Sequence, residues 1–166
     1  MLETCPAEFI DLATRLSDTA RDVAARYFRK SLSVETKPDE TPVTIADREI
    51  EAAQREVIEA AYADHGISGE EYGDAQMDAD YVWVLDPIDG TKAFLNGIPI
   101  FTNLIGLAYR GKPFLGVIDQ PTLAERWIGA VGHGATLNGT PVQTKPGPTL
   151  SEITVHATTP EMFAGA

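Results

Sequence analysis

The spacing of apolar residues changes once along the chain, near Gly66, and this change constrains the fold more than any other feature. Before Gly66, apolar residues recur every three or four positions, as in a helix that buries one face. After it, short apolar runs alternate with turn residues, which is typical of strands joined by hairpins. This order indicates an α+β fold in which two long helices pack on a mainly antiparallel sheet.

Two helices are expected before Gly66. The first covers residues 6–30 and buries the face that carries Phe9, Leu12, Ala13, Leu16, Ala20, Val23 and Tyr27. The second opens at Thr44 and stops at Gly66, because a glycine suits a helix C-terminus. Its apolar face carries Ile50, Ala53, Val57 and Ala60. The stretch SVETKPDETPVT between the helices is polar and broken by prolines, so it is expected to be a loop.

Five strands are expected after Gly66, over residues 81–86, 103–110, 113–119, 125–131 and 153–157. RGKP, residues 110–113, is a hairpin turn signal. Asn138-Gly139 is another, because Asn-Gly favours the turn types that join antiparallel strands.

Composition narrows the classes of partner. The chain has 166 residues and a net charge of −12, which disfavours nucleic acid and anionic membranes but suits divalent cations. Its one cysteine, Cys5, excludes an internal disulfide and fits a reducing compartment. We find no signal-peptide pattern and no apolar run of the roughly 20 residues that a membrane span needs. These features predict a cytoplasmic protein.

Two acidic stretches carry the candidate chemistry: ISGEEYG, residues 67–73, and LDPIDGT, residues 85–91. Pro87 keeps Asp86 out of helical geometry, so we expect the chain to turn sharply where the strand ends. Hard oxygen ligands from Glu70, Asp86 and Asp89 suit Mg²⁺, and the Ile88 carbonyl would add a further ligand. A cation between the carboxylates would make the acidic cluster tolerable.

Gly90 and Thr91 open a short helix whose first amide groups are free to receive a phosphate. Metal ions clamped by shared carboxylates activate a water and stabilise a leaving oxygen. The sequence therefore predicts a site that hydrolyses a small phosphate ester. Lys92 would either meet the phosphate or remain solvated.

Simpler interpretations stand beside this one. Asp-Pro-x-Asp-Gly is also good turn chemistry. Asp47 lies three residues after Thr44, as in a capping box that only ties off the second helix. Glu71 would then be a solvated neighbour of Glu70. The histidines (His65, His133, His156) are predicted to be structural or exposed. The tryptophans (Trp83, Trp127) are predicted to pack in the core or at an edge and not to serve as stacking platforms.

GEE followed by WVLDPIDGTKAF closely resembles the first signature of the inositol-monophosphatase-like family of Mg²⁺-dependent, lithium-sensitive phosphatases. The order of elements also fits, with TPVTIAD leading into the second helix. GVIDQPTLAERWIG, residues 116–129, is most similar to the histidinol-phosphate phosphatase branch.

The resemblance implies a role for each residue. Glu70 and Asp86 would bind the activating Mg²⁺ with the Ile88 carbonyl, and Asp86 and Asp89 would share a second ion. Thr91, paired with Asp47, would orient and deprotonate the attacking water, and the amides of Gly90 and Thr91 would hold the phosphate. Asp47, Thr91 and Glu70 are thus the implied catalytic residues.

A second family signature, a Trp-Asp dipeptide in a C-terminal α/β half, is missing, because Val84 follows Trp83 and Ile128 follows Trp127. Residues 1–150 are therefore expected to form the metal- and phosphate-binding α+β domain, the N-terminal half of a layered αβαβα fold. Residues 151–166 would begin a C-terminal domain that is missing or truncated. Family members are commonly dimeric, so a homodimer is also implied.

Three functions remain open. The first is hydrolysis of L-histidinol phosphate in histidine biosynthesis, and the second is hydrolysis of inositol 1-phosphate or of a range of sugar phosphates. The third is a catalytically silent fragment, since the expected second aspartate motif is missing. Substrate preference separates the first two.

Overall fold

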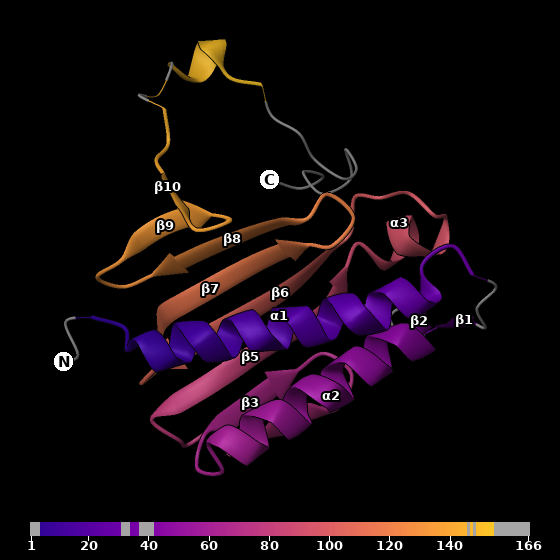
Figure 1. Cartoon of the computed structure of the whole chain (residues 1–166), viewed down its shortest axis with the longest axis horizontal. Coiled ribbons are helices and arrows are strands. Elements are labelled where there is room, and N and C mark those ends of the chain that lie inside the picture. Colours follow the sequence, from indigo (N-terminus) through magenta and orange to yellow (C-terminus); the bar gives the residue numbers. More distant parts are fainter. Residues whose placement is uncertain (1–3, 31–33, 37–41, 146, 148, 155–166) are drawn as a thin grey trace.

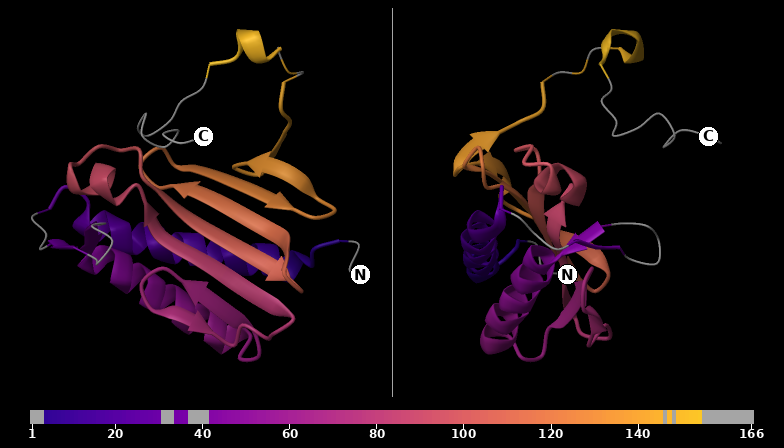
Figure 2. Two further views of the ribbon diagram at one scale, coloured as in Figure 1. Left: turned by 180° about the vertical axis from the view of Figure 1, so that it is seen from behind. Right: turned by 90° about the vertical axis from the view of Figure 1, so that its right-hand side faces the viewer.

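The computed structural model describes residues 4–30, 34–36, 42–145, 147 and 149–154. Two long helices, α1 (Ala7–Tyr27) and α2 (Ile45–Ala61), lie side by side on one face of an eight-stranded sheet (Figure 1). Viewed from behind, the sheet lies in front of the two long helices, and neither of them covers that face (Figure 2). The predicted α+β architecture is confirmed.

The sheet has the order β10-β9-β8-β7-β6-β5-β3-β4, and every pairing is antiparallel except that of β3 with β5. Its strands are β3 (Gly66–Gly69), β4 (Gly73–Ala75), β5 (Tyr81–Asp89), β6 (Thr102–Tyr109), β7 (Lys112–Gln120), β8 (Glu125–Ala130), β9 (Gly134–Leu137) and β10 (Thr140–Val142). A separate pair joins β1 (Val34–Thr36) to β2 (Pro42–Thr44). A short helix, α3 (Thr91–Leu95), follows β5, and a 3₁₀ turn covers Leu150–Glu152.

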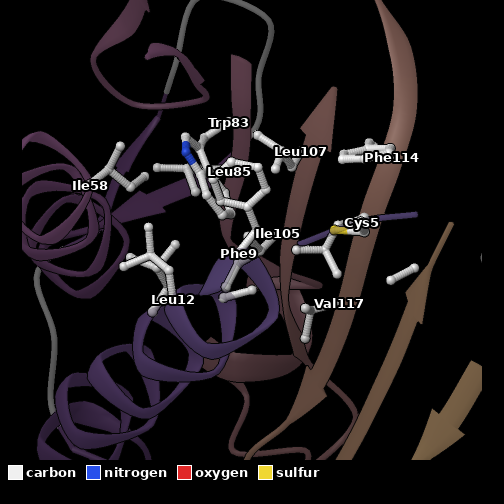
Figure 3. Close-up of a cluster of buried hydrophobic side chains, with 14 of the residues drawn as sticks. Cys5, Phe9, Leu12, Ile58, Trp83, Leu85, Ile105, Leu107, Phe114 and Val117 are labelled. Carbon is white, nitrogen blue, oxygen red and sulfur yellow. The ribbon is translucent and has the colours of Figure 1, made fainter. Parts of the chain in front are cut away.

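The larger core lies between the two helices and the sheet (Figure 3). Phe9 and Leu12 of α1 point toward the side chains of the sheet, which include Trp83 and Ile105. Ile58 of α2 belongs to the same cluster. A smaller cluster of buried side chains surrounds Ile50, Ile88, Phe94 and Phe101 at the other end of the helices. Ile88 of this second cluster belongs to the acidic stretch 85–91.

Both predicted hairpin turns are confirmed. Arg110 and Gly111, between β6 and β7, have positive φ angles of 49° and 72°. Asn138 and Gly139, between β9 and β10, have 49° and 77°. Two positive angles in succession match the twist of the flanking strands, which explains why Asn-Gly predicts this turn.

Some boundaries differ from expectation. The first helix ends at Tyr27, and α2 ends at Ala61 while Gly66 starts β3. The buried side chains of α2 also differ: Ala53 and Val57 are half-buried and Ala60 is exposed. Its buried residues are Ala46, Asp47, Ile50, Glu51, Gln54 and Ile58, so polar side chains occupy half of that list.

The strand expected at 153–157 is wrong where it can be checked. Ile153 and Thr154 belong to no strand, and residues 155–157 lie outside the described residues. The same applies to most of 151–166, so the proposed domain division there stays a prediction. Among the described residues, no helix is both long and apolar enough to cross a membrane.

Candidate functional site

The parallel pairing of β3 with β5 brings the two acidic stretches together. Gly69 pairs with Leu85, so the next residues, Glu70 and Asp86, follow at the same edge of the sheet. Carboxyl ends of parallel strands always meet in this way. The sequence prediction missed β3, and with it the reason why Glu70 lies near Asp86.

Asp86 and Asp89 are separated by a β-bulge. Asp86 pairs with Leu104 but Asp89 pairs with Thr102, so three steps on β5 match two on β6. The expected sharp turn at Pro87 is therefore wrong: β5 continues to Asp89. Proline is tolerated because bulges do not need every ladder hydrogen bond, and the bulge redirects the side chains around it.

Asn103 holds this bulge from the neighbouring strand. Its side-chain amide donates to the carbonyl oxygens of Asp86 (3.0 Å) and Pro87 (3.1 Å). Gln54 of α2 in turn donates to Asn103 Oδ1 at 3.0 Å. A buried amide chain thus connects α2 to the backbone between the two aspartates.

The carboxyl group of Asp86 has one oxygen atom without a hydrogen-bond partner among the described residues, and this atom, Oδ1, is buried. Burial is the largest cause that raises the pKa of Asp86 to about 7, followed by the charges of Glu70 and Asp89, a side-chain hydrogen bond with Glu70 and the charge of Asp47. A half-buried carboxyl group with one unsatisfied oxygen among other acids is a place where a cation is expected.

Asp47 is the N3 residue of a capping box at the start of α2. Its Oδ2 atom accepts from the backbone N–H of Thr44 (2.8 Å) and from the Thr44 hydroxyl (2.6 Å). Burial raises the pKa of Asp47, the hydrogen bonds from Thr44 oppose this, and the charge of Glu70 raises it further. The structural interpretation of Asp47 is thus confirmed, and its catalytic role stays a prediction.

The remaining predicted residues form one continuous turn. Ile88 anchors its side chain in the smaller core cluster, while its carbonyl accepts from the Thr91 hydroxyl at 3.1 Å. Gly90 is the N-cap of α3 with φ 86° and ψ 38°, a left-handed conformation that favours glycine. Thr102 donates to Asp89 Oδ2 at 3.3 Å. Among the described hydrogen bonds, Thr91 pairs with Ile88 and not with Asp47.

A cavity of about 600 Å³ lies over this turn. Glu70, Asp89, Gly90, Thr91 and the exposed Lys92 are among the residues that line it, together with the aliphatic side chains Ile98 and Ile100. Asp86 instead lines a neighbouring cavity of about 600 Å³ over the helix-free face of the sheet. No three acidic, histidine or cysteine side chains of the described residues form a complete metal-ligand cluster.

The sequence analysis missed three residues that hold the site: Glu51, Gln54 and Asn103. The signal for the first two is polar residues spaced as a helical stripe with Asp47, at positions i, i+4 and i+7 of α2. All three of these α2 side chains are buried. Buried polar groups need partners, so such a stripe points to contacts beyond the helix.

The prediction of a structural role is confirmed for Trp83, His65 and His133. Trp83 is fully buried and donates from Nε1 to His65 Nδ1 at 3.1 Å. His133 forms a hydrogen bond with the carbonyl of Cys5. Trp127 is exposed on the helix-free face of the sheet, and His156 lies outside the described residues.

Curated relatives match this chain over part of their own length. Bifunctional phosphatase IMPL2, chloroplastic, of Arabidopsis thaliana is 46% identical over 158 residues, which cover 94% of this chain and 46% of the relative. Histidinol-phosphatase of Chlorobaculum parvum is 42% identical over 135 residues, covering 81% and 52%. The chain thus spans about half the length of these relatives.

Solved structures agree with the fold. The extragenic suppressor protein SuhB of Bartonella henselae superposes with a TM-score of 0.80 at 27% identity, covering 84% of this chain and 55% of that one. An inositol monophosphatase from Zymomonas mobilis gives 0.73 at 42% identity, covering 86% and 55%. The sequence profile of the inositol monophosphatase family matches residues 6–161, and the chain belongs to that family.

Proposed function

We propose that this chain is the metal-binding part of a Mg²⁺-dependent phosphomonoesterase that hydrolyses L-histidinol phosphate to L-histidinol and phosphate. The observation that carries the chemistry is the buried, unpartnered Oδ1 atom of Asp86 in a group of mutually repelling carboxylates. A cation bound among these carboxylates would offset their mutual repulsion.

In this proposal Glu70, Asp86, Asp89 and the Ile88 carbonyl hold Mg²⁺, the hard cation that prefers oxygen ligands. When bound, Mg²⁺ would lower the pKa of a water so that it loses its proton and becomes a nucleophile, and would stabilise charge on the leaving oxygen. The family membership supports a metal-dependent phosphatase.

The other residues of the turn bind the phosphate and move the proton. Gly90 and Thr91 line the cavity at the start of α3, and their amides would donate to phosphate oxygens. Thr91 would turn its hydroxyl from Ile88 toward Asp47, so that the pair orients the attacking water and Asp47 accepts its proton. The raised pKa of Asp47, caused by burial, suits a proton acceptor.

The choice of substrate in this proposal depends on the names of the similar proteins. Three curated relatives named histidinol-phosphatase are 41–42% identical to this chain, whereas two tomato relatives named inositol monophosphatase are 31% identical. The solved inositol monophosphatase of Zymomonas mobilis, at 42%, favours the second candidate, inositol 1-phosphate or a broader set of sugar phosphates.

The test is Mg²⁺-dependent phosphate release from L-histidinol phosphate, with inositol 1-phosphate in parallel. The proposal is supported if phosphate is released preferentially from histidinol phosphate and if this release is lost in Asp86→Asn. Asp78→Asn is the matched control, because Asp78 is exposed and away from the site. Preference for inositol 1-phosphate overturns the substrate and keeps the chemistry. If Mg²⁺ binds but neither ester is cleaved, these 166 residues are catalytically silent, as the third interpretation predicts.

Two further features stay predictions. A cytoplasmic location follows from composition alone, and the Arabidopsis relative is described as chloroplastic. A homodimer is implied by the family resemblance, and sedimentation of the purified chain would test it.

A further inference from the structure

We infer that Glu51, a carboxylate buried in α2, is a positioning residue: it holds the turn between β3 and β4 so that Glu70 stays beside Asp86. Its consequence for metal binding rests on the proposed function, but its contacts do not. Glu51 is 0% exposed and lies on the same side of α2 as Asp47.

Glu51 accepts two backbone hydrogen bonds from the turn. Its Oε2 atom accepts from the N–H of Glu71 at 2.7 Å, and its Oε1 atom accepts from the N–H of Tyr72 at 3.1 Å. Both amides immediately follow Glu70 in the chain. Charge-assisted hydrogen bonds of this kind are the stronger class, and two from one carboxylate fix an orientation as well as a distance.

Arg55 completes the attachment. Its Nε atom donates to Glu51 Oε1 at 2.8 Å, and its Nη2 atom donates to the carbonyl of Gly73. The arginine side chain is itself only 13% exposed. A buried carboxylate is tolerated when it is paired and its oxygens are satisfied, and Glu51 meets both conditions.

Gly69 makes room for this contact. A Cβ atom at Gly69 would lie 1.9 Å from Glu51 Oε1 and 2.6 Å from Arg55 Nη2. Any side chain there would push the carboxylate away from the turn. Glu70 therefore lies between Gly69, which packs against Glu51, and Glu71, whose backbone N–H donates to Glu51.

Repulsion explains why such a device is needed. The charges of Glu70 and Asp86 oppose each other, and Glu70 contributes to the raised pKa of Asp86. The contacts of Glu51 hold the acids close before the metal binds, which reduces the reorganisation that binding requires.

The first test measures amide hydrogen exchange at Glu71 and Tyr72 in the metal-free 166-residue chain. Glu51→Gln keeps the size of the side chain but loses one acceptor and places an amide donor opposite the turn. We expect exchange at these two amides to become at least about tenfold faster, while amides of β6 keep their protection. Glu56→Gln, on the exposed face of α2, is the matched control.

The second test measures Mn²⁺ affinity by the electron paramagnetic resonance signal of the free ion. Loss of an outer-shell partner costs roughly 10- to 100-fold in metal affinity, and we expect this range for Glu51→Gln. Gly69→Ala should act in the same direction by displacing the carboxylate. Gly129→Ala is its control, since a Cβ at Gly129 meets no neighbour.

The outcomes separate the two proposals. Unchanged exchange at Glu71 and Tyr72 in Glu51→Gln overturns the role of Glu51. Faster exchange with unchanged Mn²⁺ affinity also overturns it, because the turn would then move without affecting the ligand. If Glu70→Gln leaves Mn²⁺ affinity unchanged, the metal site of the proposed function fails instead.

Discussion

The two ends of α2 are built from opposite chemistry. Toward its N-terminus, α2 buries the polar side chains of Asp47, Glu51 and Gln54. These side chains form hydrogen bonds with Thr44, Glu71 and Asn103, respectively. The second half of α2 buries Ile58 and leads to Tyr62, which stacks on His65 with ring centroids 4.4 Å apart. One helix therefore connects a polar end near Asp86, whose Oδ1 atom is unsatisfied, to an aromatic end.

This difference indicates that the two ends of α2 have different roles. The aromatic end has the features that stabilise a small domain: large buried rings in edge and stacked contacts. The polar end gathers like charges, which destabilise a fold unless a ligand compensates them. We therefore expect substitutions at the two ends to change stability and metal response independently, and even with opposite sign.

The largest effect is expected at the aromatic end. Trp83→Ala removes a fully buried side chain and should lower the free energy of unfolding by about 3–5 kcal/mol. Chemical denaturation measures this loss. Trp127→Ala, in which the side chain is 39% exposed, should cost less. Equal losses for the two tryptophans would contradict the comparison, as would a loss of metal affinity in a folded Trp83→Ala chain.

A smaller effect of opposite sign is expected at the polar end. The pKa of Asp86 is raised from its ordinary 3.8 to about 7 in the fold, so the folded chain resists ionisation that the unfolded chain permits, and stability is lost as the pH rises from about 4 to about 7. Asp86→Asn should therefore stabilise the metal-free chain at pH 8 by roughly 1–3 kcal/mol. At pH 5 the gain should be smaller, because only part of this loss has then occurred.

Mg²⁺ completes this test. It should raise the melting temperature of the unmodified chain but not that of Asp86→Asn, as measured by thermal denaturation with and without the ion. Asp78→Asn removes the same charge at an exposed position and should keep the full response. Destabilisation of the metal-free chain by Asp86→Asn at pH 8 would show that this carboxylate is not a strained group.

The sequence predicts the two ends unequally. Apolar spacing identifies most of the buried face of α1, and Asn138-Gly139 predicts its turn, because both depend on neighbouring residues. Motif chemistry singles out Glu70 and Asp86, yet their proximity depends on β3, a short strand with little apolar content. Glu51 was missed because its partners are 20 and 21 residues further along, and only the folded chain brings them together.

The smallest effect concerns pH at the aromatic end. Burial lowers the pKa of His65, although the nearby charge of Asp64 partly opposes this, and Nδ1 must stay unprotonated to accept from Trp83. The unfolded chain therefore takes up a proton more readily, and stability falls by at most about 1.4 kcal/mol per pH unit below pH 6.5. His65→Asn keeps an acceptor oxygen near the Nδ1 position but does not titrate. Denaturation between pH 5.5 and 7.5 should show that the unmodified chain loses stability relative to the variant as the pH falls, because the opposite contribution of Asp86 is the same in both proteins and cancels in the difference. Parallel curves would mean that the Trp83–His65 contact does not depend on the neutral imidazole, and that only the polar end responds to pH.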